Sequence, residues 1–239
     1  SGGIDSAAAL LLAARALGPS NVLAVLMPYR TSSPDSVKDA RAVVAVAGCV
    51  SEEVDITPMV DAFQRTVGCD DPLRLGNKMA RERMTILYDR AMKLGGLVCG
   101  TSNKSELLLG YSTRWGDAAF DLDPLGDLYK CHVRALAEHL GVPRPIIEKP
   151  PSADLFPGQT DEADLGLSYD DADRVLWYLV DRRGRPEAAA TELGIPEAVV
   201  RAVARRVVRT QFKRNLPLIC KVQARTVGID FRFPRDWML

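Results

Sequence analysis

Ser1-Gly2-Gly3-Ile4-Asp5-Ser6 opens the chain, and this stretch decides the fold. Its adjacent glycines let the backbone turn tightly and approach a ligand without interference from a Cβ atom. The apolar residues 7–17 that follow predict a helix, so the loop lies at a helix N-terminus, where free N–H groups and the helix dipole favour an anion. Asp5 places a carboxylate beside that anion site, which makes sense if a divalent cation bridges the two.

Composition narrows the class of protein. The 239 residues fit one α/β domain with a sizeable core. Lys plus Arg and Asp plus Glu number 31 each, so we expect neither a nucleic acid nor a membrane surface as partner. The cysteines are scattered without CxxC spacing, which favours free thiols in a reducing cytoplasm over a zinc site.

Short apolar segments alternate with helical ones through the first hundred residues. We predict strands at 22–27, 53–56 and 97–99, and helices at 34–47, from 57 onward and at 75–94. This alternation indicates a doubly wound α/β fold with a mainly parallel sheet flanked by helices. The carboxyl ends of the strands, with the 1–6 loop, the segment after Met27 and Thr101, are expected to line the ligand site.

A phosphate-binding loop normally follows a buried strand, whereas here the loop begins the sequence. We therefore expect that residues 1–239 form one N-terminally truncated domain whose innermost strand is missing.

Segments 110–128 and 150–167 lack periodicity, which is typical of functional loops. Helices are predicted again at 130–140, 169–181, 186–193 and 196–212.

The opening SGGIDS resembles the pyrophosphate-binding loop of the N-type ATP pyrophosphatases, which share the adenine nucleotide alpha hydrolase-like fold. Five further segments resemble the ammonia-dependent NAD synthetases within that superfamily, in the same order and at compatible spacing up to about Pro217: GNKMARERM at 76–84, GTSNKSE at 100–106, DPLGDLYK at 123–130, PSADL at 151–155, and GQTDE with LGLSYD at 158–170. Together they are far more specific than the hexapeptide alone.

The resemblance implies a two-step reaction. The carboxylate of deamido-NAD attacks the α-phosphorus of ATP and releases pyrophosphate, and ammonia then displaces AMP to form the amide of NAD. Activation is needed because a carboxylate would otherwise have to expel oxide, whereas the acyl adenylate expels a stable phosphate anion. The enzyme has mainly to align the groups and neutralise phosphate charge.

The resemblance also implies site residues. ATP would be bound by the 1–6 loop (Ser1, Gly2, Gly3, Ile4, Asp5, Ser6) with Thr101, Lys130 and Ser152, and Mg²⁺ by Asp5 and Glu106. Residues 150–168 would form a mobile loop that orders over the reaction. Deamido-NAD would be bound by Arg81, Arg114, Asp121, Phe212 and Lys213.

The sequence departs from the family pattern at four places, two of them short segments. The usual GDGGxD is Gly-Asp-Ala-Ala-Phe-Asp at 116–121, Arg114 stands where lysine is common, Phe212 replaces a histidine, and residues 80–83 read ARER. The first three leave the substrate contacts of this region open.

Other readings remain. One is another N-type pyrophosphatase, such as the synthetase part of GMP synthetase or a tRNA-modifying enzyme, although the chain lacks the basic surfaces or cysteine pairs of the latter. A second is a nucleotide-binding module without catalysis, against which the retained Asp5, Glu106 and Lys130 argue. A third is the synthetase part of a glutamine-dependent NAD synthetase.

The resemblance to the short ammonia-dependent type also implies a homodimer, which we expect here.

Overall fold

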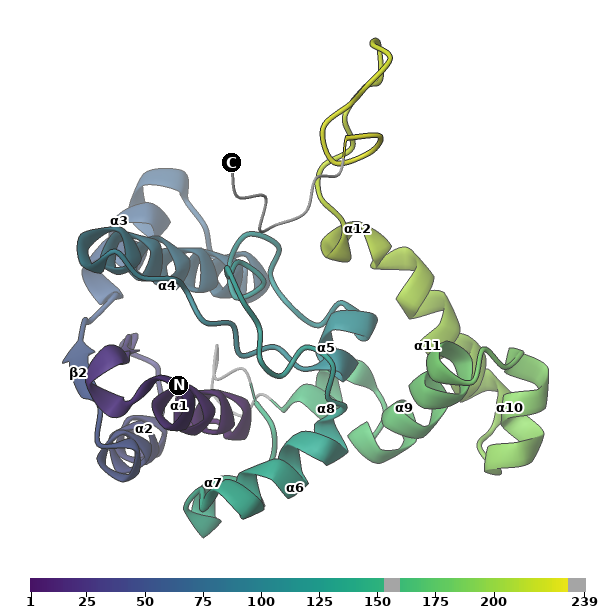
Figure 1. Ribbon diagram of the computed structural model, residues 1–239, viewed down its shortest axis with the longest axis horizontal. Helices are drawn as coiled ribbons and strands as arrows, with labels where there is room; N and C mark the ends of the chain where they lie inside the picture. The colour runs from purple at the N-terminus through teal and green to yellow at the C-terminus, as the bar shows by residue number, and fades with distance from the viewer. Residues whose placement is uncertain (153–159, 232–239) are drawn as a thin grey trace.

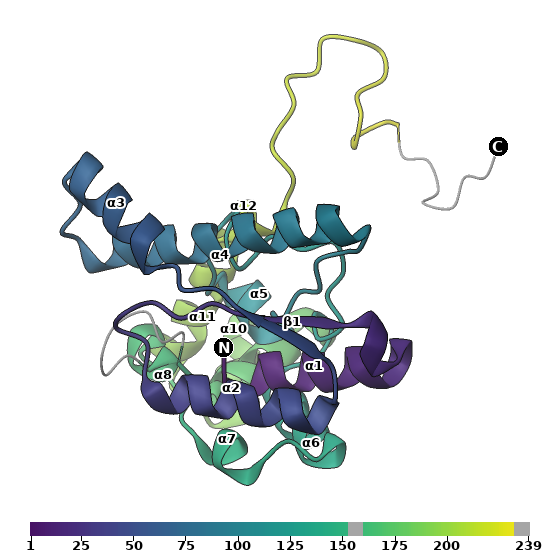
Figure 2. The ribbon, with the colours of Figure 1, turned by 90° about the vertical axis from the view of Figure 1, so that its left-hand side faces the viewer.

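A small parallel sheet lies between two layers of helices in the computed structural model, which describes residues 1–152 and 160–231 (Figures 1 and 2). The elements, in chain order, are α1 Ile4–Leu17, a 3₁₀ turn η1 Pro19–Asn21, β1 Leu23–Leu26, α2 Pro34–Ala47, β2 Val50–Glu53, α3 Thr57–Val67, α4 Pro72–Leu94, α5 Lys104–Leu109, α6 Lys130–Leu140, α7 Arg144–Glu148, α8 Asp161–Leu165, α9 Tyr169–Leu176, a π-helical turn η2 Trp177–Asp181, α10 Pro186–Leu193, α11 Glu197–Arg209 and α12 Gln211–Arg214. No helix of the described residues is long and apolar enough to cross a membrane.

The sheet consists of β1 and β2 in parallel, with Leu23 opposite Val50 and Leu26 opposite Glu53. Helices cover both of its faces: α1 and α2 lie on one side, and α3 and α4 on the other (Figure 2). The buried side chains follow this division, since one cluster joins α1, α2, α6 and α7 while a second joins α3 and α4. The predicted class, α/β with a parallel sheet flanked by helices, is confirmed.

The predicted strand at 53–56 is wrong in its bounds, because the ladder begins at Val50. Backbone bonds nevertheless continue beyond β2, since the N–H of Val54 donates to Leu26 O at 2.8 Å and that of Ile56 to Pro28 O at 3.0 Å. The start of the strand was not predicted because Val-Ser-Glu-Glu is largely polar. Such a sequence is possible here since three of the four residues are exposed.

The third predicted strand is also shorter than expected. Residues 97–99 contribute only an isolated parallel bridge between Cys99 and Leu122. Two backbone bonds flank it, from Asp121 N to Val98 O at 2.9 Å and from Gly100 N to Leu122 O at 2.7 Å. The segment 110–128, predicted to be irregular, therefore supplies the partner of this strand.

Several helix bounds differ as well. The first helix begins at Ile4 rather than residue 7, so Asp5 lies in its first turn. The predicted helix 169–181 changes to a π-helical turn at Trp177, and the one at 196–212 divides at Thr210 into α11 and α12. Within the segment predicted to be a loop, α8 is helical from Asp161, while residues 153–159 lie outside the described part.

A third cluster of buried side chains joins α9, α10 and α11 with Leu109 and Tyr129. This helical part packs on α5 and α6 and lies beside the sheet domain (Figure 1). After α12 the chain leaves the body as an extended tail in both views (Figures 1 and 2).

Candidate active site

The loop at residues 1–6 is closed by its own serines. Ser6 Oγ donates to Gly3 O at 3.0 Å and lies 2.9 Å from Ser1 Oγ, and Gly3 N donates to Ser1 Oγ at 3.4 Å. Gly3 is the N-cap of α1 and has no side chain to satisfy the first N–H groups of the helix. The loop therefore presents backbone donors and the positive end of a dipole to an incoming anion.

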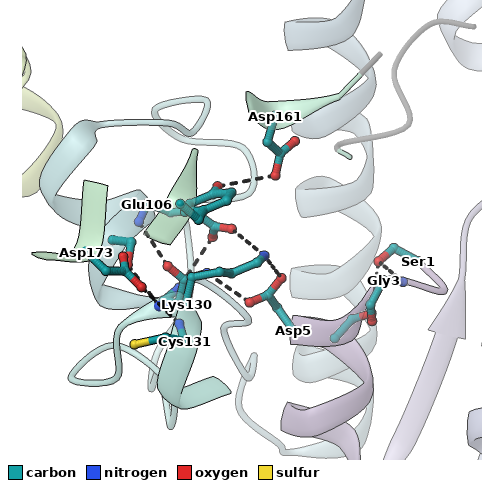
Figure 3. Close-up of polar contacts among 12 residues, drawn as sticks. Ser1, Gly3, Asp5, Glu106, Lys130, Cys131, Asp161 and Asp173 are labelled. Carbon is teal, nitrogen blue, oxygen red and sulfur yellow. Dashed lines mark hydrogen bonds and ion pairs between the residues drawn. The ribbon is translucent and has the colours of Figure 1, made fainter. Parts of the chain in front are cut away.

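Lys130 brings two carboxylates together beside the first turn of α1 (Figure 3). Its Nζ donates to Asp5 Oδ2 at 2.5 Å and to Glu106 Oε1 at 3.3 Å. The Lys130 side chain is only 2% exposed, and those of Asp5 and Glu106 are 17% and 15% exposed. Asp5 of α1 thus meets Glu106 of α5 and Lys130 of α6, from which more than 100 residues separate it, at one cation.

The protonation of this cluster follows from its burial and charges. Burial lowers the pKa of Lys130, but the carboxylates of Asp5 and Glu106 outweigh this and raise it overall. Burial raises the pKa of Glu106, and the negative charge of Asp5 raises it further while Lys130 opposes both. Burial and Asp5 therefore disfavour ionised Glu106, and a bound cation would favour its ionisation.

Asn103 positions both acids. Its Nδ2 donates to Asp5 Oδ1 at 2.8 Å, and its Oδ1 accepts from the Glu106 backbone N–H at 3.0 Å. Glu106 Oε2 accepts from Asn103 N at 3.4 Å, which completes a capping box at the start of α5. The sequence contains this signal as Asn three residues before Glu, but Asn103 was not predicted as a site residue.

Two further residues, Asp161 (Figure 3) and Tyr169, lie next to this cluster. The Tyr169 hydroxyl donates to Asp161 Oδ2 at 3.3 Å, and Lys130 Nζ lies 5.1 Å from the centre of the Tyr169 ring. Asp161 Oδ1 is buried without a hydrogen-bond partner among the described residues. Neither residue was predicted individually, although both lie in the segments that carry the resemblance.

The other predicted ATP contacts, Thr101 and Ser152, are exposed at the ends of their segments. Thr101 directly follows the Cys99 bridge and Gly100, as expected for the carboxyl end of a strand.

Predicted dinucleotide-binding residues form a second group, centred on Arg114. Its guanidinium lies 5.0 Å from the Trp115 ring and 5.7 Å from the Phe212 ring, and Arg81 donates to its backbone oxygen at 3.4 Å. Lys213 Nζ instead donates to the carbonyls of Gly110 and Ser112, at 2.7 and 2.6 Å.

Asp121 lies apart from this group. Its Oδ2 accepts from Val98 N at 2.8 Å and its Oδ1 from the Tyr88 hydroxyl at 3.4 Å. Asp121 and Lys213 thus both bond to backbone groups of other segments. The prediction, which gave them a role in substrate binding, did not include these contacts.

The altered 116–121 loop is accommodated at Gly100. A Cβ atom on Gly100 would lie 2.6 Å from the Phe120 ring, so this glycine makes room for the phenylalanine.

Comparison of this chain with known protein families and structures identifies its family. A family model described as NAD synthase matches residues 1–217. The chain belongs to the NAD synthase family. The NH(3)-dependent NAD(+) synthetase of Chlorobium phaeobacteroides (strain BS1) is 55% identical over 237 residues, which cover 99% of this chain and 85% of that protein.

Two solved structures resemble this NAD synthase family member closely. NMN synthetase from Francisella tularensis gives a TM-score of 0.79 at 32% identity, covering 92% of this chain and 86% of that one. The NH3-dependent NAD synthetase from Campylobacter jejuni, in complex with the nitrate ion, gives 0.77 at 33% identity with the same coverage. The resemblance seen in the sequence is thereby confirmed at the level of family and fold.

Proposed function

We propose that this chain is an ammonia-dependent NAD synthetase, which converts deamido-NAD, ATP and ammonia into NAD, AMP and pyrophosphate. The observation that carries the proposal is the meeting of Asp5, Glu106 and Lys130 at the first turn of α1, which the 1–6 loop begins. Such a buried arrangement of two acids and a lysine is what a polyphosphate with a divalent cation requires.

In the first step an oxygen of the nicotinate carboxylate attacks the α-phosphorus, the bond between the α-phosphorus and its bridging oxygen breaks, and pyrophosphate leaves. The N–H groups of residues 1–6 stabilise the charge that develops on this leaving group. In the second step the lone pair of ammonia attacks the acyl carbon, a proton is lost from nitrogen, and AMP leaves with the bonding electrons of the carbon–oxygen bond.

Asp5 and Glu106 fit Mg²⁺, since they offer hard oxygen atoms that already converge on one cation. No group of three or more His, Cys, Asp or Glu among residues 1–152 and 160–231 can hold a metal ion, so phosphate oxygens would complete the coordination. Bound Mg²⁺ would neutralise phosphate charge and stabilise the leaving group. Lys130, freed from the two acids, is then able to pair with a phosphate.

Arg81, Arg114, Asp121, Phe212 and Lys213 are proposed to bind deamido-NAD. Arg114 supports this best, since its Nε is buried without a hydrogen-bond partner among the described residues and its guanidinium lies near two aromatic rings. A guanidinium so oriented suits a phosphate or carboxylate of the dinucleotide.

A second substrate is favoured by one observation, the TM-score of 0.79 with NMN synthetase. An enzyme of that activity amidates the mononucleotide rather than the dinucleotide. Parallel assays with nicotinate mononucleotide and deamido-NAD decide between the two through the ratio of their kcat/KM values.

We further propose a homodimer in the cytoplasm. The tail after α12 exposes large apolar side chains, among them Leu218 at 98% and Val222 at 84%, which a second copy would cover. All five cysteines lie in the described residues and are free thiols, as a reducing compartment favours. Sedimentation at assay concentration tests the dimer, and a fully active monomer would contradict it.

The variants Asp5→Ala and Glu106→Ala test the metal assignment. Each is expected to lower Mg²⁺-dependent pyrophosphate release at least about 100-fold, because charge stabilisation of the transition state is lost. The circular dichroism spectrum should stay unchanged. Asp89→Asn, whose side chain is 65% exposed, serves as a control and should retain activity. Turnover like that of the wild type in both alanine variants would remove the assignment.

A further inference from the structure

Lys149 reaches from the end of α7 to the first two turns of α2. Its Nζ donates to Ser36 Oγ at 3.1 Å and to Asp39 Oδ2 at 3.3 Å. The side chain of Lys149 is 32% exposed and that of Asp39 is 18% exposed. The lysine is thus held in a defined place while its side chain keeps partial access to solvent.

That place adjoins the 1–6 loop. Ser36 is buried, and its backbone oxygen would lie 2.2 Å from a Cβ atom on Gly2. Ser36 therefore contacts both: its backbone lies against the loop, and its hydroxyl accepts a hydrogen bond from Lys149. One residue separates the Lys149 ammonium from the backbone that would cradle the phosphates.

The charge balance of the site calls for a further cation. ATP carries about four negative charges at neutral pH, and such charge must be neutralised for transfer. Bound Mg²⁺ and Lys130 together contribute three positive charges, of which Asp5 and Glu106 cancel two when ionised. About three negative charges of the nucleotide remain, and Lys149 is a cation beside the loop to which no role has been given.

We propose that Lys149 is a further ATP-binding residue, which pairs with the terminal phosphates held by residues 1–6. Asp39 and Ser36 hold its ammonium group in place when no nucleotide is bound. A lysine suits this role because its compact charge on a flexible stem moves between partners by side-chain rotation alone. The inference rests on the proposed function, since that function places the ATP phosphates at the loop.

A purely structural role is the competing interpretation. In that case the ion pair of Lys149 with Asp39 fastens α7 to α2, and removing either partner has the same effect. If Lys149 binds phosphate, only the loss of the lysine weakens the nucleotide. Asp39→Asn breaks the same ion pair while keeping the cation, so it is the matched control.

Calorimetric titration with Mg²⁺-ATP, AMP and inorganic pyrophosphate separates the two interpretations. Lys149→Gln and Lys149→Met, which keeps the stem, should bind ATP and pyrophosphate about tenfold more weakly, the size of one charge-assisted contact. AMP binding should be unchanged. Lys149→Arg should recover most of the affinity, and Asp39→Asn should bind ATP as tightly as the wild type or more tightly.

Two results would overturn the inference. One is wild-type affinity for ATP and pyrophosphate in both Lys149→Gln and Lys149→Met. The other is an equal loss of affinity in Asp39→Asn and Lys149→Gln, which would show that the ion pair acts structurally. Binding is measured without NAD formation, so a wild-type protein that binds ATP but makes no NAD would contradict the proposed function and leave this test intact.

Discussion

Gly2 is the position of the 1–6 loop with the least room for a side chain. Its φ of +79° lies in the left-handed region, and an added Cβ atom would lie 2.2 Å from the backbone oxygen of Ser36. At Gly3 an added Cβ atom would lie 3.6 Å from Ser1 Oγ, an ordinary contact. Two glycines suggest the phosphate loop. Only Gly2 is required by the fold itself, because a side chain at Gly3 would meet no close contact in the absence of a ligand.

Gly2→Ala should therefore destabilise the protein by at least about 2 kcal/mol, since left-handed strain and displacement of α2 add together. Gly3→Ala should change the free energy of unfolding by less than about 0.5 kcal/mol. Thermal or urea denaturation of both variants measures the difference. Equal stability of the two would contradict the close approach of Gly2 to Ser36.

Asp123 is a half-buried residue whose carboxylate is only weakly compensated. Both of its side-chain oxygens are buried and make no hydrogen bond of good geometry among the described residues. Burial raises its pKa to about 6, the facing Leu125 N–H lowers it in part, and the charge of Asp5 raises it again. The charged form is therefore unfavourable in the folded protein.

Asp123→Asn should stabilise the protein above pH 6 by about 1–2 kcal/mol, after a discount for partial access of solvent. Because the pKa is higher in the folded than in the unfolded state, the wild type is stabilised by protonation below pH 4 and loses this stability as the pH rises through 6. Denaturation curves at pH 4, 5, 6 and 8 should show the gain of the variant growing up to pH 6. A gain that is independent of pH would contradict the pKa assignment.

Among the elements, α5, α6 and α9 are fastened together by one buried side chain. Asp173 of α9 accepts from Ser105 Oγ of α5 and, at 2.9 Å, from the Cys131 N–H of α6. Ser105 Oγ in turn accepts from Lys130 N at 2.9 Å. The starts of the two helices that carry Glu106 and Lys130 are thereby fixed relative to each other (Figure 3).

Asp173→Ala should cost about 2–3 kcal/mol of stability, because it leaves buried donors unsatisfied at two helix starts. It should also lower kcat, since Glu106 and Lys130 lose their relative position. The control is Asp170→Ala in the same helix, whose side chain is 75% exposed and should change stability by less than about 0.5 kcal/mol. Equal effects of the two substitutions would show that the connection between the helices is unimportant.

Helices whose ends carry local signals were predictable from the sequence. The bounds of α2, α6 and α10 match the prediction, because each ends at a glycine in the left-handed region, and α2 and α10 also begin with proline. The strands were less predictable. β2 is largely polar, and the bridge at Cys99 depends on Leu122, a partner that is distant in the sequence.

The residues of the site likewise divide into those that the sequence predicted and those that it did not. The resemblance indicated Asp5, Glu106 and Lys130, and the structure brings them together. The contribution of Asp173, Asp161 and Lys149 depends on contacts between distant segments, which no local pattern contains. Lys213 and Asp121 stay predicted substrate contacts, and the backbone groups that they hold in the structure were not foreseen.

At the scale of the molecule, two groups of side chains lie on separate parts of the fold. The acids and Lys130 lie where α1, α5 and α6 meet, while Arg114 lies near Trp115 and Phe212 close to the start of the tail. A dinucleotide substrate, being long, suits two such groups, with its reactive carboxylate toward the first. This arrangement is what the proposed amidation needs.

The most direct test of the account is an assay of NAD formation from ATP, Mg²⁺ and deamido-NAD, with ammonia and glutamine supplied separately. We expect NAD and AMP in equal amounts with ammonia and no appreciable NAD with glutamine alone. Intact ATP binding without NAD or AMP from any nitrogen source, in a protein with the native fold, would contradict the central claim that this site activates and amidates a nicotinate carboxylate.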